Sequence, residues 1–355
     1  MLKERKYFIS FRPSLSLPSL LEIQKQSYDY FLKKELPKVL KEMLTLEDLS
    51  GQKFQLNFLN YFLEESKFDE EICRKRNLTY ESPLRAELRL INKQTGKKKN
   101  QIVYLGDLPL MTKRGTFIIN GVERVIIQQL SRSSGVLFTA ALIKRTGERL
   151  YGAKVIPERG AWLEFETDGE KAIWVRIDRG RKIIATALLR VFGLGTNEEI
   201  VEAFKKIGGD INSPFLLSTL EKDEAKNEEE GVKEIYRKIR PGEMATLENA
   251  RSLIHSMFFR SNRYSLGTVG RFKINQRLGF DEKISASGGK SQFLEAKDLI
   301  AILTEITRLS INQEEADDID HLNNRRIKAV GELVAERLRV GLMRLQRIIR
   351  DKMTI

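Results

Sequence analysis

The stretch AWLEFETDGEKAIWVRID, residues 161–178, decides how this part of the chain folds. Apolar and polar residues alternate on both sides of a short polar centre, which predicts two half-buried antiparallel strands. The apolar residues of both strands have odd numbers, so they face one core only if each is paired with another odd-numbered residue across the hairpin. The numbers of two paired residues must therefore sum to an even number. We therefore expect a three-residue loop, residues 168–170, with Phe165 opposite Ile173.

Both tryptophans fall on the charged face of this predicted hairpin. In the expected register Trp162 lies opposite Arg176. A large apolar ring on a charged face is an informative exception to normal burial. One interpretation is a stacking platform for a nucleobase, worth roughly 1–3 kcal/mol per base. The other is that a further domain covers this face, or that Trp162 stacks on Arg176, and the hairpin alone favours this second interpretation.

Similar alternation marks further strands outward from the hairpin. Residues 54–58 and 84–90 alternate strictly, and residues 102–105 and 116–119 are also strand-like. The dipeptide Asn120-Gly121 follows directly and predicts a tight turn. The stretch TGKKKN, residues 95–100, predicts a basic turn.

Helical spacing of apolar residues appears in several other stretches. They are residues 14–36, 198–208, 247–259, 296–308 and 330–350. We expect Pro37 to end the first of these helices, because proline lacks a backbone N–H. The polar stretch EKDEAKNEEE, residues 221–230, predicts a solvated helix or linker without a site.

Composition limits the functional classes. The chain has 355 residues, a length that suggests two or three domains, and 41% of them are hydrophobic, which is enough for buried cores. Its net charge of +13, from 62 basic and 49 acidic residues, favours a polyanionic partner, most simply nucleic acid, over a soluble protein with a charged surface. A single cysteine, Cys73, excludes an intrachain disulfide and favours a reducing compartment. Without a long apolar run or a signal-peptide pattern, we expect a cytoplasmic protein that does not meet a membrane.

Seven strings, in order and over essentially the whole chain, resemble the N-terminal part of the beta subunit of bacterial-type DNA-directed RNA polymerases. They are SLPSLLEIQKQSYDYFL (16–32), YLGDLPLMTKRGTFIINGVERVIIQQLSRSSGV (104–136), IPERGAWLEFETD (156–168), VRIDRGRK (175–182), IRPGEMATLENA (239–250), YSLGTVGRFKINQRL (264–278) and DDIDHLNNRRIKAVGELVAERLRVGL (317–342). An ordered set of this length is far more specific than a single short motif.

The resemblance implies an architecture. Residues 1–130 with 326–355 would form the protrusion, and residues 131–325 would form an inserted lobe of the short kind. Together with the strand and helix patterns, this predicts an α+β, mixed multi-domain fold. The abrupt end of the chain, without a turn or cap signal, is expected of a fragment truncated at its C-terminal end.

The resemblance also implies a function. The chain would be a fragment of the transcribing nucleotidyltransferase, gripping downstream DNA and the non-template strand and docking factors, without catalytic residues of its own. The family's catalytic Mg²⁺ lies in the beta-prime subunit, so this chain needs no cofactor. Implied partners are the beta-prime subunit, the alpha dimer, omega, a sigma factor, DNA and RNA. The string DDIDH, residues 317–321, invites a metal site, but ion pairing and base recognition explain it better than metal ligation does.

Four residues match nucleic-acid-binding positions of the family. Trp162 matches a tryptophan that stacks on an unpaired non-template base near the downstream duplex. The resemblance therefore favours the stacking platform over the interpretation that another domain or Arg176 covers the ring. Arg132, Asp320 and Arg325 match a pocket for a flipped guanine. A carboxylate can accept from the N1–H and N2–H₂ edge of guanine, while arginine donates to O6 and N7. The alternative is that these residues tie the lobe to the protrusion by salt bridges.

Two further groups match family positions. Arg124, Ile127 and Gln129 match the edge of the rifampicin pocket, whose central segment would lie beyond residue 355. Arg124 more simply has a structural or RNA-proximal role.

Lys98, Lys99 and Asn100 match the surface where the transcription-repair coupling factor docks on the protrusion. The family segment has isoleucine where this chain has Lys98, and glutamate where it has Asn100. Because these side chains differ, we expect the docking surface to persist through main-chain pairing at a strand edge. The competing hypotheses are a regulator-docking module centred on this turn and a stand-alone basic nucleic-acid-binding protein.

Overall fold

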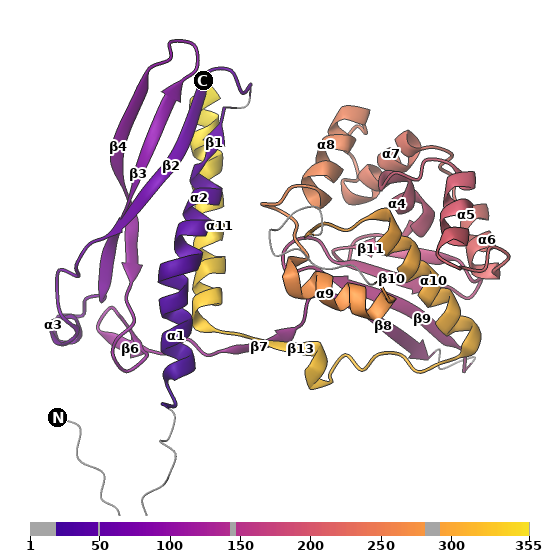
Figure 1. Ribbon diagram of the computed structural model, residues 1–355, viewed down its shortest axis with the longest axis horizontal. Helices are drawn as coiled ribbons and strands as arrows, with labels where there is room; N and C mark the ends of the chain where they lie inside the picture. The colour runs from indigo at the N-terminus through magenta and orange to yellow at the C-terminus, as the bar shows by residue number, and fades with distance from the viewer. Residues whose placement is uncertain (1–18, 49, 143–146, 281–291, 355) are drawn as a thin grey trace, which may run out of the picture. The chain divides into compact units, whose positions relative to one another are not determined.

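The computed structural model describes residues 19–48, 50–142, 147–280 and 292–354. The chain divides into two compact units: unit 1 is Met1–Leu130 with Ile327–Ile355, and unit 2 is Ser131–Arg326. Each unit has its own buried apolar cluster. Both combine helices with antiparallel sheets, which confirms the predicted α+β class (Figure 1).

The sheet of unit 1 is antiparallel, in the order β1-β2-β3-β4. Its strands are β1 (Leu46–Glu47), β2 (Phe54–Leu63), β3 (Glu81–Asn92) and β4 (Lys98–Pro109). The predicted alternation holds along β3, where Leu84, Ala86 and Leu88 are buried in the core. A strand with one apolar face buries that face alone, so the other face of this sheet stays accessible.

Helices cover the apolar face of this sheet. They are α1 (Glu22–Tyr30), the π-helical η1 (Phe31–Glu35), α2 (Leu36–Leu44) and α11 (Val330–Thr354). The expectation that Pro37 ends the first helix is wrong. Pro37 lies in the first turn of α2, directly after the π-helical segment, and proline is tolerated there because an N–H in a first turn need not be bonded within the helix. The expected start of this helix at residues 14–18 lies outside the described residues.

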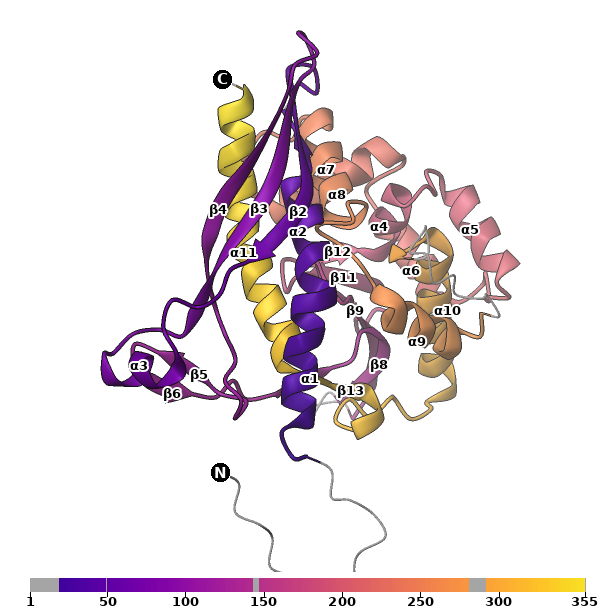
Figure 2. The same cartoon turned by 60° about the vertical axis from the view of Figure 1, so that its left-hand side comes forward.

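The last helix returns to the first. Gly331 donates its backbone N–H to the Ser27 hydroxyl over 2.9 Å. A Cβ at Gly331 would lie 2.1 Å from the Ser27 carbonyl oxygen, so only glycine allows the two helices to approach this closely. Figures 1 and 2 both show α11 beside α1 and α2. Segments about 300 residues apart therefore form one core.

Smaller elements complete unit 1. They are α3 (Glu70–Lys75), β5 (Phe117–Ile119) and β6 (Val122–Arg124). The turn between β5 and β6 has positive φ at Asn120 (51°) and Gly121 (77°), as the sequence predicts. Cys73 is buried in α3 and is a free thiol.

The sheet of unit 2 has the order β12-β11-β10-β9-β8 and is antiparallel. Its strands are β8 (Gly135–Leu142), β9 (Arg149–Ile156), β10 (Leu163–Thr167), β11 (Ile173–Ile177) and β12 (Ile183–Ile184). Residues 163, 165 and 167 are buried, as are 173, 175 and 177, so the predicted apolar faces of the hairpin are confirmed.

The predicted register of this hairpin is wrong by one pair. Phe165 lies opposite Val175 rather than Ile173, so five residues connect the strands instead of three. The Asp168 carboxylate closes the longer loop by accepting the backbone N–H of Ala172 (2.8 Å), while Lys171 takes a positive φ of 64°. The sum of paired numbers remains even, which is why the faces were predicted correctly.

Helices share one apolar core with the buried face of the unit 2 sheet. They are α4 (Ala185–Val191), α5 (Asn197–Lys206), α6 (Pro214–Glu221), α7 (Glu228–Ile239), α8 (Leu247–Phe258), α9 (Gly267–Leu278) and α10 (Ala296–Asn312). The prediction that residues 221–230 are simply solvated is wrong at Asp223. Its buried carboxylate lies 2.9 Å from the buried Arg190 guanidinium. Burial of a charged group requires such an oppositely charged partner.

The chain passes between the two units twice, in β7 (Gln129–Arg132) and β13 (Arg325–Lys328). These two strands pair as a small sheet of their own. A short 3₁₀ helix, Leu322–Asn324, leads into β13. The two units divide after Leu130 and after Arg326, whereas the sequence predicts the second boundary after residue 325.

Candidate functional site

Several strand ends of unit 2 lie in one row. The registers of β8 to β11, continued by one residue beyond β10, align Gly135, Ile156, Trp162 and Asp178 across the sheet. Neighbouring strands lie about 4.7–4.9 Å apart, so Trp162 is about 10 Å from Gly135 along this row. Arg132 is three residues before Gly135. Trp162 and Arg132 therefore share one end of the sheet.

Trp162 is held by the turn that follows β11. Its backbone N–H donates to the Asp178 carboxylate over 2.8 Å, and its carbonyl accepts the Asp178 N–H over 3.0 Å. Asp178 and Arg179 both have positive φ, 48° and 60°, and the Gly180 N–H closes the turn on the Ile177 carbonyl. Consecutive left-handed residues other than glycine are unfavourable, and such strain often accompanies functional sites.

The half-buried Trp162 lines an open cavity of about 250 Å³ with Asp178 and Arg179. The expected position of Trp162 opposite Arg176 is wrong, because the register is shifted. Arg176 lies opposite Glu164 and forms an ion pair with Glu166 over 3.4 Å. The arginine that lines the cavity together with Trp162 is Arg179 instead.

Trp174, on the same charged face, has a structural role. Its indole N–H donates to Asp168 over 2.8 Å, and Lys222 lies 6.0 Å from its ring centroid. Burial raises the pKa of Asp168, but hydrogen bonds from Trp174, Ala172 and Lys222 outweigh this and lower it overall. The two tryptophans therefore differ: Trp174 is engaged by its own unit, whereas Trp162 borders a cavity.

Two distant segments meet at Arg132 and Arg325. The Ser133 N–H donates to the Asn324 carbonyl over 2.9 Å, so Arg132 and Arg325 are neighbours on the paired strands β7 and β13. Arg325 forms an ion pair with Asp320 over 2.5 Å, and that carboxylate is largely exposed (79%). Arg132 is exposed and, within the described part of the chain, has no ion pair. The three residues form a cluster with two cations and one carboxylate.

The other acidic residues of DDIDH serve the local fold. Asp317 accepts the Phe138 backbone N–H over 2.8 Å and contacts Arg277 over 3.3 Å. Asp318 accepts the Asp320 N–H over 2.9 Å, and His321 accepts the Asn323 N–H through Nδ1. In the ranges that the structure describes, no three His, Cys, Asp or Glu residues are grouped to hold a metal ion.

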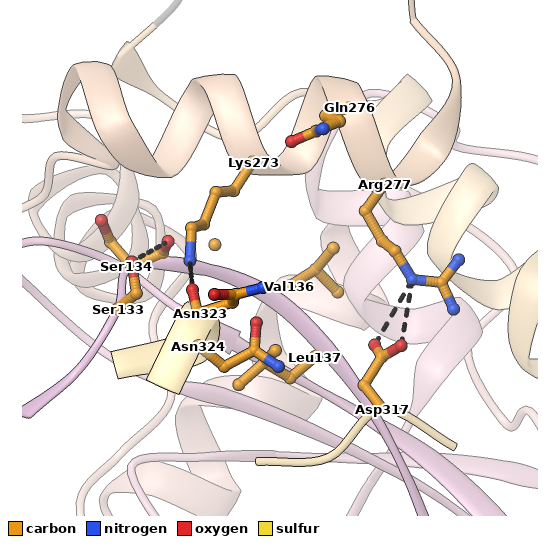
Figure 3. A pocket seen from close by; sticks show the side chains of 11 residues that line it. Ser133, Ser134, Val136, Leu137, Lys273, Gln276, Arg277, Asp317, Asn323 and Asn324 are labelled. Carbon is orange, nitrogen blue, oxygen red and sulfur yellow. Dashed lines mark hydrogen bonds and ion pairs between the residues drawn. The ribbon is translucent and has the colours of Figure 1, made fainter. Parts of the chain in front are cut away.

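A larger cavity of about 450 Å³ adjoins this cluster (Figure 3). Its walls are Ser133, Ser134, Gly135, Val136, Leu137, Lys273, Gln276, Arg277, Asp317, Asn323 and Asn324. Ser133 directly follows Arg132 and Asn324 directly precedes Arg325, so the cavity and the cluster share a backbone wall.

The charges of this cavity are unequally compensated. Arg277 pairs with Asp317 and with Glu305 (3.0 Å) and lies 4.6 Å from the Phe138 ring centroid. Lys273 donates to the Asn323 carbonyl over 2.6 Å, and burial lowers the pKa of its ammonium group. No role was predicted for Lys273 from the sequence. A usable signal was that Lys273 and Arg277 are like charges four residues apart on a helix, an arrangement that is unfavourable without compensation.

The predicted positions of unit 1 lie on exposed surfaces. Arg124 ends β6, Gln129 begins β7, and Ile127 between them is 79% exposed. Their assignment to the edge of a rifampicin pocket stays a prediction.

The expected basic turn is wrong in its second half. Lys98, Lys99 and Asn100 begin strand β4, where they pair with β3, and Arg89 donates to the Asn100 side chain over 2.9 Å. In the described sheet β4 is an edge strand, and all three residues are exposed. They therefore border a strand edge rather than a loop.

A family model described as RNA polymerase Rpb2, domain 2, matches residues 124–328. The chain belongs to this family. It is 40% identical over 351 residues to the DNA-directed RNA polymerase subunit beta of Syntrophomonas wolfei subsp. wolfei, covering 99% of this chain and 30% of the relative. The same subunit of Clavibacter michiganensis subsp. michiganensis is 40% identical over 387 residues, covering 99% of this chain and 32% of the relative.

The chain thus spans about a third of the length of these curated relatives. The family match begins at the end of β6 and ends with β13, so it contains all of unit 2. The resemblance predicted from the sequence is confirmed at the level of the Rpb2 domain 2 family. No helix among the described residues is long and apolar enough to cross a membrane.

Proposed function

We propose that this chain is part of the beta subunit of DNA-directed RNA polymerase and that unit 2 holds the non-template strand beside the downstream duplex. Unit 2 would be the lobe and unit 1 the protrusion. The partners would be beta-prime, the alpha dimer, omega, a sigma factor, DNA and RNA, in the cytoplasm. Polymerisation would use Mg²⁺ held by beta-prime, and this chain would supply binding without a catalytic group.

The observation that carries the proposal is the shared sheet end. Trp162 and Arg132 approach this end from different strands, and Asp320 and Arg325 join it from a segment almost two hundred residues later. A half-buried indole next to a cation suits a stacked base. A cluster of two arginines and one carboxylate suits the edges of guanine.

The charges of this cluster suit a base. The Asp320 carboxylate is paired with Arg325 yet remains exposed, so one of its oxygens can accept from guanine. Arg132 can donate to O6 or N7 without breaking an ion pair in the described structure. The two positive charges also attract the phosphate backbone, so binding should weaken with salt.

The test is a Trp162→Ala substitution in the assembled polymerase, measured as affinity for a DNA bubble. Loss of one stacked base, worth roughly 1–3 kcal/mol, should weaken binding about 5- to 150-fold. The control is Trp174→Phe, which removes a hydrogen bond to Asp168 far from the cavity and should leave affinity unchanged. Equal bubble affinity for Trp162→Ala and wild type would refute the stacking role.

A second candidate function rests on β4. Its edge is exposed from Lys98 to Tyr104, including the apolar Ile102. An exposed strand edge can add a strand from a partner, with main-chain hydrogen bonds supplying affinity. The transcription-repair coupling factor is the expected partner. Hydrogen exchange with and without that factor tests this, since strand addition should protect amides of β4.

A further inference from the structure

We propose that the cavity beside Lys273 binds a backbone phosphate of the single strand whose bases occupy Trp162 and the Arg132–Asp320–Arg325 cluster. The inference rests on the proposed function and adds a contact to it. The ligand is a phosphodiester, and the residue that grips it is Lys273 on α9.

Among the described residues that line this cavity, one charged group, the Lys273 ammonium, has no oppositely charged partner. Three of its lining residues are ionisable: Lys273, Arg277 and Asp317. Arg277 and Asp317 neutralise each other, and Glu305, which also contacts Arg277, is itself paired with Arg308 over 2.7 Å. Lys273 instead contacts a neutral carbonyl, and no carboxylate among the described residues pairs with it. A partly buried cation without a counterion favours an anionic ligand.

The lysine is also pre-positioned. Gly135 lies against its stem, because a Cβ at Gly135 would come 3.0 Å from the Lys273 Cβ. At the other end, the ammonium group donates to the Asn323 carbonyl (Figure 3). An ammonium has three donors, so two remain for a ligand. A side chain fixed at both ends loses little further entropy when a phosphate binds.

The position of the cavity fits a DNA single strand whose bases contact both proposed base sites. Gly135, which touches Lys273, stands in the same row as Trp162, about 10 Å away by strand spacing. Ser133 and Asn324 connect the cavity wall to Arg132 and Arg325. A phosphate at Lys273 would thus lie beside the base cluster and on the same sheet end as the stacking platform.

The test uses the full chain of 355 residues and a short fluorescent single-stranded DNA containing guanine. Affinity is measured by anisotropy over a series of salt concentrations for wild type and Lys273→Gln. Losing one phosphate contact should reduce the slope of log affinity against log salt by about 0.7. The matched control is Lys205→Gln, which removes the same charge from an exposed position on α5 and should leave the slope unchanged.

Oligonucleotides with one neutral methylphosphonate linkage identify the phosphate without changing the protein. In wild type, neutralising one particular linkage should lower the slope by the same amount. In Lys273→Gln, neutralising that linkage should have no further effect. The substitution and the neutral linkage remove the same contact, so their effects are not additive in a double-mutant cycle. Equal sensitivity of wild type and Lys273→Gln to every linkage overturns the proposal.

Three other outcomes separate the alternatives. If inorganic phosphate protects Lys273 from acylation while no linkage depends on Lys273, the cavity binds a free anion and the strand proposal is wrong. If Trp162→Ala weakens binding but Lys273→Gln leaves the slope unchanged, the phosphate site fails and the proposed function stands. If neither substitution affects binding, both fail.

Discussion

The sheets of the two units are both antiparallel, but unit 1 exposes a strand edge whereas unit 2 exposes the ends of its strands. In unit 1 the long strand β4 exposes an edge, and its accessible side chains are scattered along it. In unit 2 the strands are shorter, and polar side chains collect where the strands end. A strand edge offers main-chain groups to a partner, whereas the strand ends offer side chains that distinguish one ligand from another.

The helices around the two sheets differ in a related way. In unit 2, buried ion pairs fix helices to one another, including Arg271–Asp298 over 2.8 Å. In unit 1, the corresponding helix contact is the partly exposed Arg339–Glu42 pair over 3.3 Å. Since α9 carries both Arg271 and Lys273, the buried pair also holds the proposed phosphate site in place.

The largest expected effect is therefore on the stability of unit 2. Asp298→Ala removes the buried carboxylate that pairs with the Arg271 guanidinium and should destabilise unit 2 by about 3–5 kcal/mol. Hydrogen exchange resolved by peptide measures each unit separately. The control, Glu314→Ala, breaks an exposed pair with Arg308 and should cost about 1 kcal/mol or less. An equal loss of protection in unit 1 would contradict the separation into two cores.

The next effect concerns base preference. Asp320→Ala should remove about 1–3 kcal/mol of discrimination for guanine over adenine in a single strand, because the carboxylate that accepts from N1–H and N2–H₂ is lost. Competition between oligonucleotides that differ at one base measures it. Glu315→Ala, an exposed acidic residue nearby, is the control. An unchanged preference for guanine would make Asp320 a structural partner of Arg325.

A smaller effect tests how Trp162 is positioned. Asp178→Ala removes the carboxylate that accepts the backbone N–H of Trp162 and should weaken single-strand binding by about 1 kcal/mol. The sign discriminates, because loss of a negative charge alone would strengthen binding to a polyanion. Asp178→Asn keeps an acceptor oxygen and should retain most of the affinity. Tighter binding by Asp178→Ala would show that charge matters and positioning does not.

The smallest effect is expected on the exposed strand of unit 1. Ile102→Ser, at a position 53% exposed, should change the stability of unit 1 by about 0.5 kcal/mol or less. Leu88→Ala in the neighbouring strand β3 removes a buried side chain and should cost about 2–5 kcal/mol. Denaturant unfolding compares them. A large cost for Ile102→Ser would mean that this face is packed and unavailable to a partner.

These two sheets also show what the sequence could predict. The buried faces of β3, β10 and β11 follow from a period of two, which does not depend on the length of the loop. The register of the hairpin does depend on it, and the loop is set by the hydrogen bond of Asp168 and the positive φ of Lys171. Neither is visible in an alternating pattern.

The site was predictable only in part. Arg132, Asp320 and Arg325 were grouped because they resemble family positions, and the pairing of β7 with β13 brings them together. Lys273 was missed because its importance comes from what surrounds it: a glycine against its stem and neighbours that neutralise each other. Asp223 was misjudged for a similar reason, since its partner Arg190 lies 33 residues away.

The most direct test of a single-strand site at this end of the unit 2 sheet is the fluorescence of Trp162. With only two tryptophans in the chain, a Trp174→Phe variant leaves Trp162 as the one reporter. A base stacked on its indole should quench the emission when a single-stranded guanine-containing oligonucleotide binds, and a duplex of the same sequence should quench it less. Binding of the single strand with unchanged Trp162 emission would contradict the account.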